Sequence, residues 1–206
     1  MLSVSILGVE DIKNKIKILD NLDVDYIHLD IMDGIFVNNK TWNINDIMPV
    51  LQNIKKPLDV HLMVKDVKKY IDDFKVLNPK FITFHLEVEN DIKSLISYVK
   101  SLSIGVGIAI NPSTSVDLLL PYLPFIDLVL VMSVEPGLGG QKFIETTIDK
   151  VNNLCEFKKK YNFLIEVDGG INNINIRKLN SDINVVGSYI TKSDNYLEQI
   201  NNLRKG

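Results

Sequence analysis

Histidine and aspartate residues stand where they could bind a metal ion together. His28 and Asp30 are two residues apart in a short apolar run, and His61 stands near the end of the next run. Because side chains alternate along a strand, His28 and Asp30 point to the same side and present an imidazole nitrogen and a carboxylate oxygen together. Divalent transition metals accept both kinds of ligand, and His61 can supply a second nitrogen.

Asp168 is a second acidic residue whose position indicates chemistry. It closes the apolar run Leu164–Val167 and is followed directly by a Gly-Gly pair. A carboxylate there is costly unless it is paired or bound to a cation, and the glycines indicate that a ligand approaches the backbone. The alternative is a loop aspartate or a helix N-cap. Asp33, which also precedes a glycine, is interpreted as a turn residue.

The chain has three histidines, His28, His61 and His85, and each lies at or near the end of a predicted strand. A single buried histidine is more often a core residue with satisfied hydrogen bonds than a ligand. Three histidines at one rim of the fold favour a functional site for the set.

Glycine-containing loops follow the last three predicted strands and indicate phosphate binding. They are Pro136–Gln141, Gly169–Ile171 and Gly187-Ser188. One glycine pair would be weak evidence, because tight turns need glycine anyway, but three in succession favour an anion held by backbone N–H groups. No lysine or arginine lies inside these loops, so we expect recognition to depend on backbone amides.

Eight short apolar runs must position these residues. They are Leu2–Leu7, Tyr26–Ile31, Leu58–Met63, Phe81–His85, Ile104–Ile110, Leu128–Val134, Leu164–Val167 and Ile183–Val186. Each is four to eight residues long and rich in β-branched or aromatic residues, which is typical of strands buried on both faces. Amphipathic helical stretches lie between them, most clearly at 66–77, 91–102 and 146–161.

Eight alternations of strand and helix predict a parallel sheet, and a closed (β/α)8 TIM barrel is the most economical arrangement. An open doubly wound sheet is the alternative. No linker divides the chain, so we expect residues 1–206 to form a single barrel domain. In such a barrel the active site lies at the carboxyl ends of the strands, where the polar residues above fall.

Composition excludes several classes of function. Hydrophobic residues make up 46% of the chain, charged residues 24%, and the net charge is −3, so we do not expect nucleic acid as a partner. No apolar stretch reaches the roughly 18 residues that span a bilayer, so we do not expect a membrane either. The single cysteine, Cys155, fits a reducing compartment and is interpreted as packed and inert. The first residues lack the basic region of a signal peptide, and we therefore expect a cytoplasmic protein.

Three methionines stand at strand ends: Met32, Met63 and Met132. We interpret them as barrel packing or, where they face a pocket, as a soft apolar wall.

The motifs together resemble the signature blocks of ribulose-phosphate 3-epimerases, in the order of that family and over positions 5 to 188. The stretches are Ser5–Leu7, His28–Gly34 with Phe36-Val37, Val60–Val64, Ile110–Pro112, Met132–Phe143, Val167–Ile171 and Gly187-Ser188. The chain departs from the usual family residues at Asn38, Leu138, Tyr189 and the segment Gly8–Glu10. These departures concern substrate fit and loop closure, and none removes a ligand or a carboxylate.

The resemblance implies a (β/α)8 barrel with one divalent metal ion held by His28, Asp30, His61 and Asp168. It implies Asp30 and Asp168 as the catalytic acid/base groups. It further implies that substrate or its phosphate contacts Ser5, His61, Gly137, Leu138, Gly139, Gly140, Gly169, Gly170, Gly187 and Ser188.

The implied reaction is epimerisation at C3 of a ketose phosphate, which interconverts D-ribulose 5-phosphate and D-xylulose 5-phosphate in the pentose phosphate pathway. Inverting a carbon beside a ketone needs an acid/base group on each face and a cation that stabilises the enediolate. Two histidines and two carboxylates suit zinc, iron, manganese or cobalt, and the ligand types do not choose among them.

Three alternatives stay open at this point. A 3-epimerase of a hexulose phosphate would use the same chemistry in a longer pocket. A metal-dependent hydrolase would use the cation to activate water, but it gives no reason for carboxylates on opposite faces. A non-catalytic sugar-phosphate binding protein would not need both aspartates. The sequence also leaves open whether the chain forms a homo-oligomer.

Overall fold

Eight parallel strands close into one barrel in chain order in the computed structural model, which describes residues 1–88 and 91–204. The closed barrel confirms the predicted fold class and excludes the open sheet. The strands are β1 (Leu2–Ser5), β2 (Tyr26–Met32), β3 (Leu58–Met63), β4 (Phe81–His85), β5 (Gly105–Ile110), β6 (Leu128–Met132), β7 (Leu164–Asp168) and β8 (Ile183–Val186).

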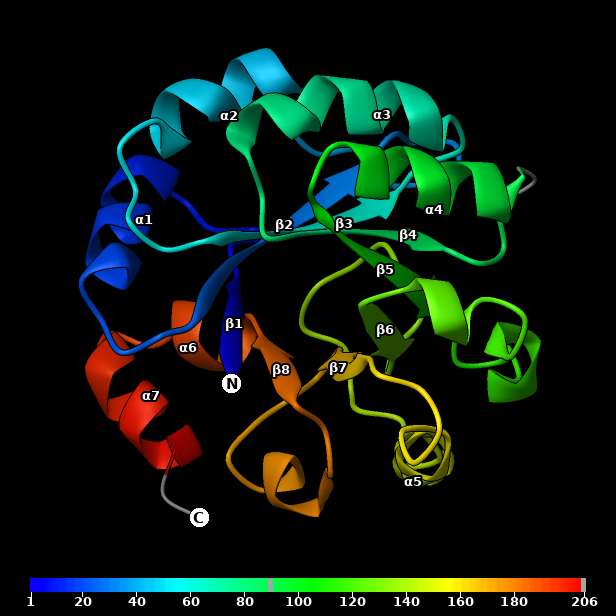
Figure 1. The fold of residues 1–206 in the computed structure, drawn as a ribbon. Coiled ribbons are helices and arrows are strands. Elements are labelled where there is room, and N and C mark those ends of the chain that lie inside the picture. Colours follow the sequence, from blue (N-terminus) through cyan, green and yellow to red (C-terminus); the bar gives the residue numbers. More distant parts are fainter. Residues whose placement is uncertain (89–90, 205–206) are drawn as a thin grey trace.

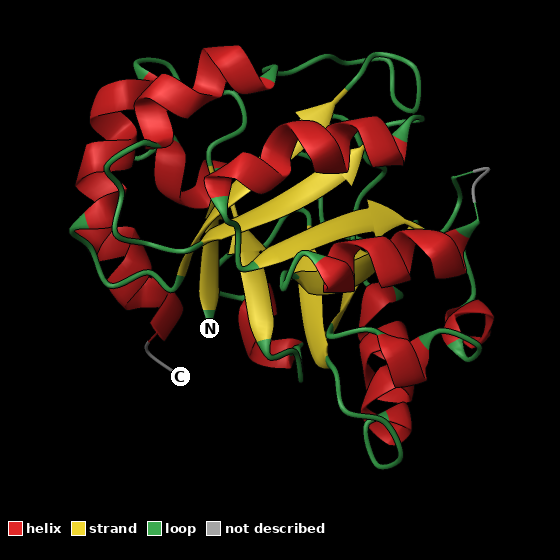
Figure 2. Ribbon diagram, turned by 45° about the horizontal axis from the view of Figure 1, so that its top comes forward, coloured by secondary structure: helices red, strands yellow, loops and turns green. Residues whose placement is uncertain are grey.

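Helices surround the barrel on its outside (Figures 1 and 2). The α-helices are α1 (Ile12–Asp20), α2 (Ile44–Leu51), α3 (Val67–Phe74), α4 (Ile92–Ser101), α5 (Thr147–Phe157), α6 (Ser188–Thr191) and α7 (Tyr196–Arg204). The 3₁₀ helices are η1 (Lys75–Leu77), η2 (Val116–Leu119), η3 (Leu123–Phe125) and η4 (Asn175–Lys178).

Two of the expected strand-to-strand helices are replaced by 3₁₀ turns, which corrects the regular alternation. The chain passes from β5 to β6 through η2 and η3, and from β7 to β8 through η4. Pro121 and Pro124 explain the first case, because proline lacks the N–H that an α-helix needs. The segment predicted at 146–161 is also shorter than expected, since α5 ends at Phe157 and the chain turns back to enter β7.

The helices pack through regular apolar faces. In α3, Val67, Ile71 and Phe74 are fully buried, and their spacing places them on one side of the helix. The side chain of Asp66 accepts a hydrogen bond from the backbone N–H of Lys69 over 3.2 Å and so caps the first turn. The other face of the helix stays polar and meets solvent.

Alternation along each strand separates two environments. In β2, Ile27, Leu29 and Ile31 join the large core between strands and helices, whereas His28 and Asp30 are also buried but lie outside that core. Strand register brings polar residues of neighbouring strands to the same level, with His28 beside Asp59 and Asp30 beside His61. The strands are buried on both faces, as predicted, but in β2 only the face toward the helices is wholly apolar. The face toward the inside of the barrel is partly polar.

Apolar side chains fill the amino-terminal part of the barrel interior. Tyr26, Phe81, Leu128 and Ile183 each begin a strand and belong to one buried cluster. Further along β2 and β3 the buried residues are partly polar, whereas the apolar cluster continues along β6, and a cavity opens at the carboxyl ends of the strands.

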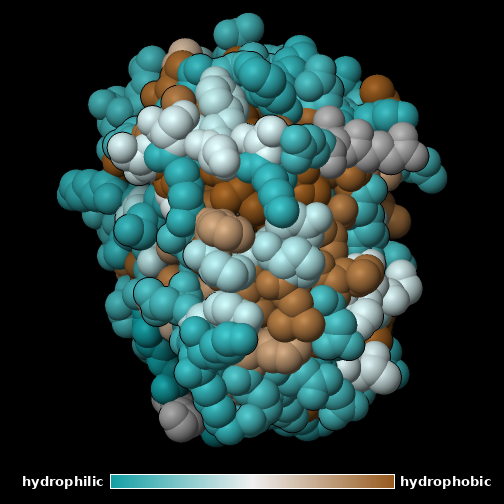
Figure 3. All heavy atoms as spheres, turned by 45° about the vertical axis from the view of Figure 1, so that its right-hand side comes forward, coloured by the Kyte–Doolittle hydropathy of each residue, from teal (hydrophilic) through white to brown (hydrophobic). Residues whose placement is uncertain are grey.

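Hydrophobic side chains also reach the surface. Figure 3 shows a hydrophobic area on one face, surrounded by hydrophilic residues. Exposed large hydrophobic residues include Ile35, Phe125 and Leu138. Such side chains are usual on protein surfaces, and a homo-oligomer stays a prediction.

Candidate active site

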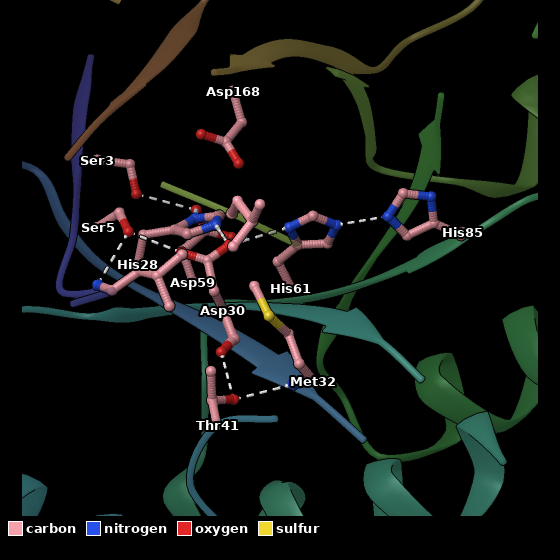
Figure 4. A network of polar contacts seen from close by, with 12 residues as sticks. Ser3, Ser5, His28, Asp30, Met32, Thr41, Asp59, His61, His85 and Asp168 are labelled. Carbon is pink, nitrogen blue, oxygen red and sulfur yellow. Dashed lines mark hydrogen bonds and ion pairs between the residues drawn. The ribbon is translucent and has the colours of Figure 1, made fainter. Parts of the chain in front are cut away.

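Four side chains converge near the carboxyl ends of three strands. His28 and Asp30 come from β2, His61 from β3 and Asp168 from β7, and each offers one ligand atom within 4.8 Å of the others. Strand pairing places Asp30 directly beside His61. Asp168 reaches the group from across β8 and β1 because the barrel is closed, and Figure 4 shows its carboxyl turned toward the other three. The structure thus brings together the predicted ligand set.

The nitrogen atoms that face this group lack hydrogen-bond partners among the described residues. Oδ1 of Asp30 lies 3.4 Å from Nε2 of His28 and 3.4 Å from Nδ1 of His61. Both nitrogens are buried without a hydrogen bond, although buried polar atoms normally have one. Two nitrogen atoms and two carboxylates directed at one place have the composition and arrangement that suit a divalent transition metal.

Each histidine is held from its far side. His28 donates from Nδ1 to Oδ2 of Asp59 over 2.7 Å, and the hydroxyl of Ser3 donates to the same oxygen over 2.9 Å. Nε2 of His61 lies 2.8 Å from Nε2 of His85. Asp59 and the role of His85 were missed by the sequence reasoning. A signal existed for Asp59, which stands two residues before His61 and so shares its side of β3.

The two aspartates have different proton affinities. Burial alone would raise the pKa of Asp30, but the charge of His28 holds it below its usual range. Burial, together with the charge of Asp30, raises the pKa of Asp168 to about 7. Ser5 donates to Oδ2 of Asp30 over 2.7 Å, which also favours the ionised form of that carboxyl. The pair can therefore hold one proton at neutral pH.

The histidines differ as well. Burial lowers the pKa of His61 to about 4, so this ring is neutral. Burial would also lower the pKa of His28, but the carboxylates of Asp59 and Asp30 raise it well above its usual value. A proton on Nε2 of His28 and a metal cation would compete for the same lone pair.

Deeper in the barrel, His28, Asp59 and Glu166 form a second group within 4.8 Å. Burial, then the charge of Asp59, raises the pKa of Glu166 well above its usual value, which favours the neutral carboxyl. Nδ1 of His28 already donates to Asp59, so it has no lone pair for a cation there. We interpret this group as a support of His28 and not as a metal site.

A cavity of ≈ 580 Å³ opens beside the four residues. Most residues predicted to contact substrate line it: Ser5, Gly137, Leu138, Gly139, Gly140, Gly169, Gly170, Gly187 and Ser188. Asp30, Asp168 and the methionines Met32, Met63 and Met132 line it as well. His28 and His61 are fully buried and are not among its lining residues.

Positive charge reaches one end of the cavity from outside the glycine loops. A Cβ placed on Gly140 would lie 3.6 Å from Nζ of Lys192 and 3.9 Å from Oγ of Ser188. Lys15, from α1, also lines the cavity, and its ammonium lies over the ring of Tyr196. The loops themselves contain no lysine. Recognition of phosphate by backbone amides stays a prediction, to which the structure adds a lysine side chain beside Gly140.

The loop after β2 is held over the cavity. Asp33 accepts hydrogen bonds from the backbone N–H groups of Ile35, Phe36 and Lys65, which confirms its structural role. Nδ2 of Asn39 donates to the carbonyl oxygen of Gly137 over 3.2 Å and ties this loop to the glycine loop after β6.

Comparison with known proteins decides the family. A family model described as the ribulose-phosphate 3 epimerase family matches residues 1–191.

The chain belongs to the ribulose-phosphate 3-epimerase family.

Curated members of this family resemble it over most of their length. The ribulose-phosphate 3-epimerase of Helicobacter pylori (strain J99) is 39% identical over 191 residues, covering 89% of this chain and 88% of the relative. That of Buchnera aphidicola subsp. Baizongia pistaciae is 42% identical over 181 residues, covering 84% and 79%. The predictions of the family and of an isomerase are thereby confirmed.

Solved structures agree on the fold. The crystal structure of KGPDC from Streptococcus mutans superposes with a TM-score of 0.72 at 13% identity, covering 98% of this chain and 94% of that one. At that identity the likeness shows the barrel architecture alone. Among the described residues, no helix has the length and apolar character to cross a membrane. The cytoplasmic location stays a prediction.

Three of the positions that depart from the usual residues of the ribulose-phosphate 3-epimerase family lie in different surroundings. Tyr189 packs against the main core and is not a lining residue of the cavity. Leu138 is 65% exposed on the loop at the cavity mouth. Asn38 is exposed next to Asn39, which holds the loop. Cys155 is half-buried in α5, and burial raises the pKa of its thiol, which favours an inert role.

Proposed function

We propose that this chain inverts the configuration at C3 of a pentulose phosphate and so interconverts ribulose 5-phosphate and xylulose 5-phosphate. The observation that carries the proposal is the pair Asp30 and Asp168, which line one cavity from β2 and β7 and meet at a group able to bind a metal. The names of the curated relatives support the same substrate.

The two carboxyl groups supply the proton transfers. One takes the proton from C3 on one face of the substrate, and the other returns a proton on the opposite face, which produces the inverted centre. Ser5, through its 2.7 Å hydrogen bond, keeps the carboxylate of Asp30 oriented. The methionine side chains line the cavity and exclude water from the reacting carbon.

His28, Asp30, His61 and Asp168 would hold one divalent cation. When bound, a cation such as zinc, iron, manganese or cobalt would stabilise negative charge that develops on substrate oxygen atoms beside C3. Because His28 and His61 are fully buried, they can act on the substrate only through such a group and not by direct contact.

The phosphate would lie at the opposite end of the cavity. Backbone N–H groups of the loops at Gly139, Gly140 and Gly187 can approach an anion closely, and Ser188 offers a hydroxyl. Lys192 adds a positive charge beside Gly140. This arrangement fixes the distance between the anion and the two aspartates, and so selects the length of the sugar.

Incubation with ribulose 5-phosphate in deuterated water tests the proposal. NMR should detect xylulose 5-phosphate together with deuterium at C3, and both should disappear with a chelator and return with Zn²⁺ or Mn²⁺. A metal-loaded protein that neither exchanges this proton nor forms the epimer would contradict the assignment. A hexulose phosphate assayed in parallel decides between the two chain lengths.

A further inference from the structure

His61 meets a second histidine on the side away from the aspartates. Its Nδ1 faces Asp30, and its Nε2 lies 2.8 Å from Nε2 of His85. At that distance one nitrogen donates a proton and the other accepts it. The pair therefore has two arrangements. In one, His61 carries the proton on Nε2 and its Nδ1 has a free lone pair; in the other, the proton of His61 is on Nδ1.

Glu87 breaks the symmetry between these arrangements. Nδ1 of His85 lies 3.3 Å from Oε2 of Glu87. Burial would raise the pKa of Glu87, but hydrogen bonds with His85, Thr114 and Asn111 hold it at about 2, so the group is a carboxylate and only accepts. His85 must then carry its proton on Nδ1 and accept at Nε2 from His61.

The position of Glu87 is itself fixed. Its Oε1 accepts from the backbone N–H of Asn111 over 2.8 Å and from the hydroxyl of Thr114. Lys150 of α5 donates to the carbonyl oxygens of Asn111 and Thr114 over 2.9 and 2.6 Å, which holds that loop against the carboxylate. The second oxygen of Glu87 is left to face His85.

The rings are also held in place. His61 and His85 are fully buried, and their ring centroids lie 5.0 Å apart. The ring of Phe36 also lies against His85, with a centroid distance of 4.8 Å. Neither imidazole can turn over without displacing these neighbours. Nδ1 of His61 therefore stays toward Asp30, and Nδ1 of His85 stays toward Glu87.

We propose that Glu87 and His85 are positioning residues that keep the proton of His61 on Nε2, so that the Nδ1 lone pair of His61 is free for the divalent cation. The inference rests on the metal site of the proposed function. It extends that site by two residues that touch neither the cavity nor the four ligand atoms. His28, whose Nδ1 donates directly to Asp59, needs no such intermediate.

Glu87→Gln gives a sharp test. Because the backbone N–H of Asn111 must face an acceptor, the amide oxygen of the glutamine takes the place of Oε1, and its NH₂ group faces His85. His85 then accepts at Nδ1 and donates from Nε2, and His61 is forced to carry its proton on Nδ1. The metal-free variant, titrated with Co²⁺ against a chelator, should bind the ion about 10- to 100-fold more weakly than the wild type.

Nitrogen NMR of histidine-labelled, metal-free protein reads the protons directly, and the chain has only three histidines to assign. The wild type should show His61 protonated on Nε2, and Glu87→Gln should show it on Nδ1. Glu156→Gln, an exposed change on α5, is the matched control and should leave both measurements unchanged.

The outcomes separate the two proposals. Equal Co²⁺ affinity in folded Glu87→Gln and wild-type protein would overturn the positioning role of Glu87 and His85. A wild-type His61 protonated on Nδ1 would overturn it as well. If Glu87→Gln does not fold, the wild-type NMR measurement decides alone. A wild-type protein that binds no Co²⁺ but shows the expected proton positions would overturn the metal site. The hydrogen bonds from His61 through His85 to Glu87 would then have a structural role only.

Discussion

His28 donates from Nδ1 to Oδ2 of Asp59 over 2.7 Å, on the side of the imidazole that faces away from Asp30. A carboxylate behind a ligand histidine fixes its tautomer and makes its other nitrogen more basic. Asp59 stays ionised in this position, because the charge of His28 lowers the pKa of its carboxyl despite burial.

Replacing Asp59 by Asn should therefore weaken metal binding without removing a ligand. We expect a loss of about 10- to 100-fold in affinity for Zn²⁺, measured by chelator competition. Ser3→Ala is the control, because it removes a hydrogen bond to the same oxygen but keeps the carboxylate. This variant should lose less affinity for Zn²⁺ than Asp59→Asn. Equal affinities for the Asp59→Asn and wild-type proteins would contradict this role.

The two carboxyl groups that we propose as acid/base groups should be separable by isotope exchange. Asp30→Asn and Asp168→Asn should each lower the rate of epimerisation by at least about 10²–10⁴-fold. One of them can retain exchange of the C3 proton with solvent, because removal and return on the same face need one base only. NMR of product and deuterium content, with metal content measured in each variant, checks this. Near wild-type epimerisation by either metal-loaded variant would refute the two-carboxyl mechanism.

Lys192 should contribute to phosphate binding and not to proton transfer. Lys192→Met should raise KM for the phosphorylated sugar roughly fivefold, since an exposed ion pair contributes about 1 kcal/mol or less. kcat should change little, and the KM of the variant should depend less on ionic strength than that of the wild type. Lys13→Met, on the exposed side of α1, is the control. An unchanged KM for Lys192→Met would exclude the contact.

Metal-free protein should lose stability as the pH rises from about 4 to 7 because of Asp168. The folded state holds this proton up to a pKa of about 7, whereas the usual value is 3.8. The stabilisation from this group is thus complete below pH 4 and lost above 7. The amide side chain introduced by Asp168→Asn cannot ionise, so this variant should not lose stability in the same way. The difference in unfolding temperature between the variant and the metal-free wild type should therefore grow in favour of the variant as the pH rises from about 4 to 7. Parallel curves for the two proteins would argue against a raised pKa.

Much of the fold could be predicted from the sequence. Eight runs of β-branched and aromatic residues define strands locally, and their alternation with helical faces admits few topologies. The alternation of side chains along a strand predicts that His28 and Asp30 lie on the same side of β2. Because Asp168 ends β7, it is predicted to lie at the same rim of the barrel. The family could also be inferred, because its blocks retain their order along the whole chain.

Other features depended on the tertiary structure. The contacts of His28 with Asp59 and of His61 with His85 follow from the register between strands, which local sequence does not state. Lys192, which follows β8, lies beside Gly140, in the loop after β6, because β6 and β8 both pair with β7. Local residue types determined the strands and the candidate ligands. Which buried nitrogen meets which carboxylate was decided by long-range pairing, since hydrogen bonds act over about 3 Å and join residues distant in sequence.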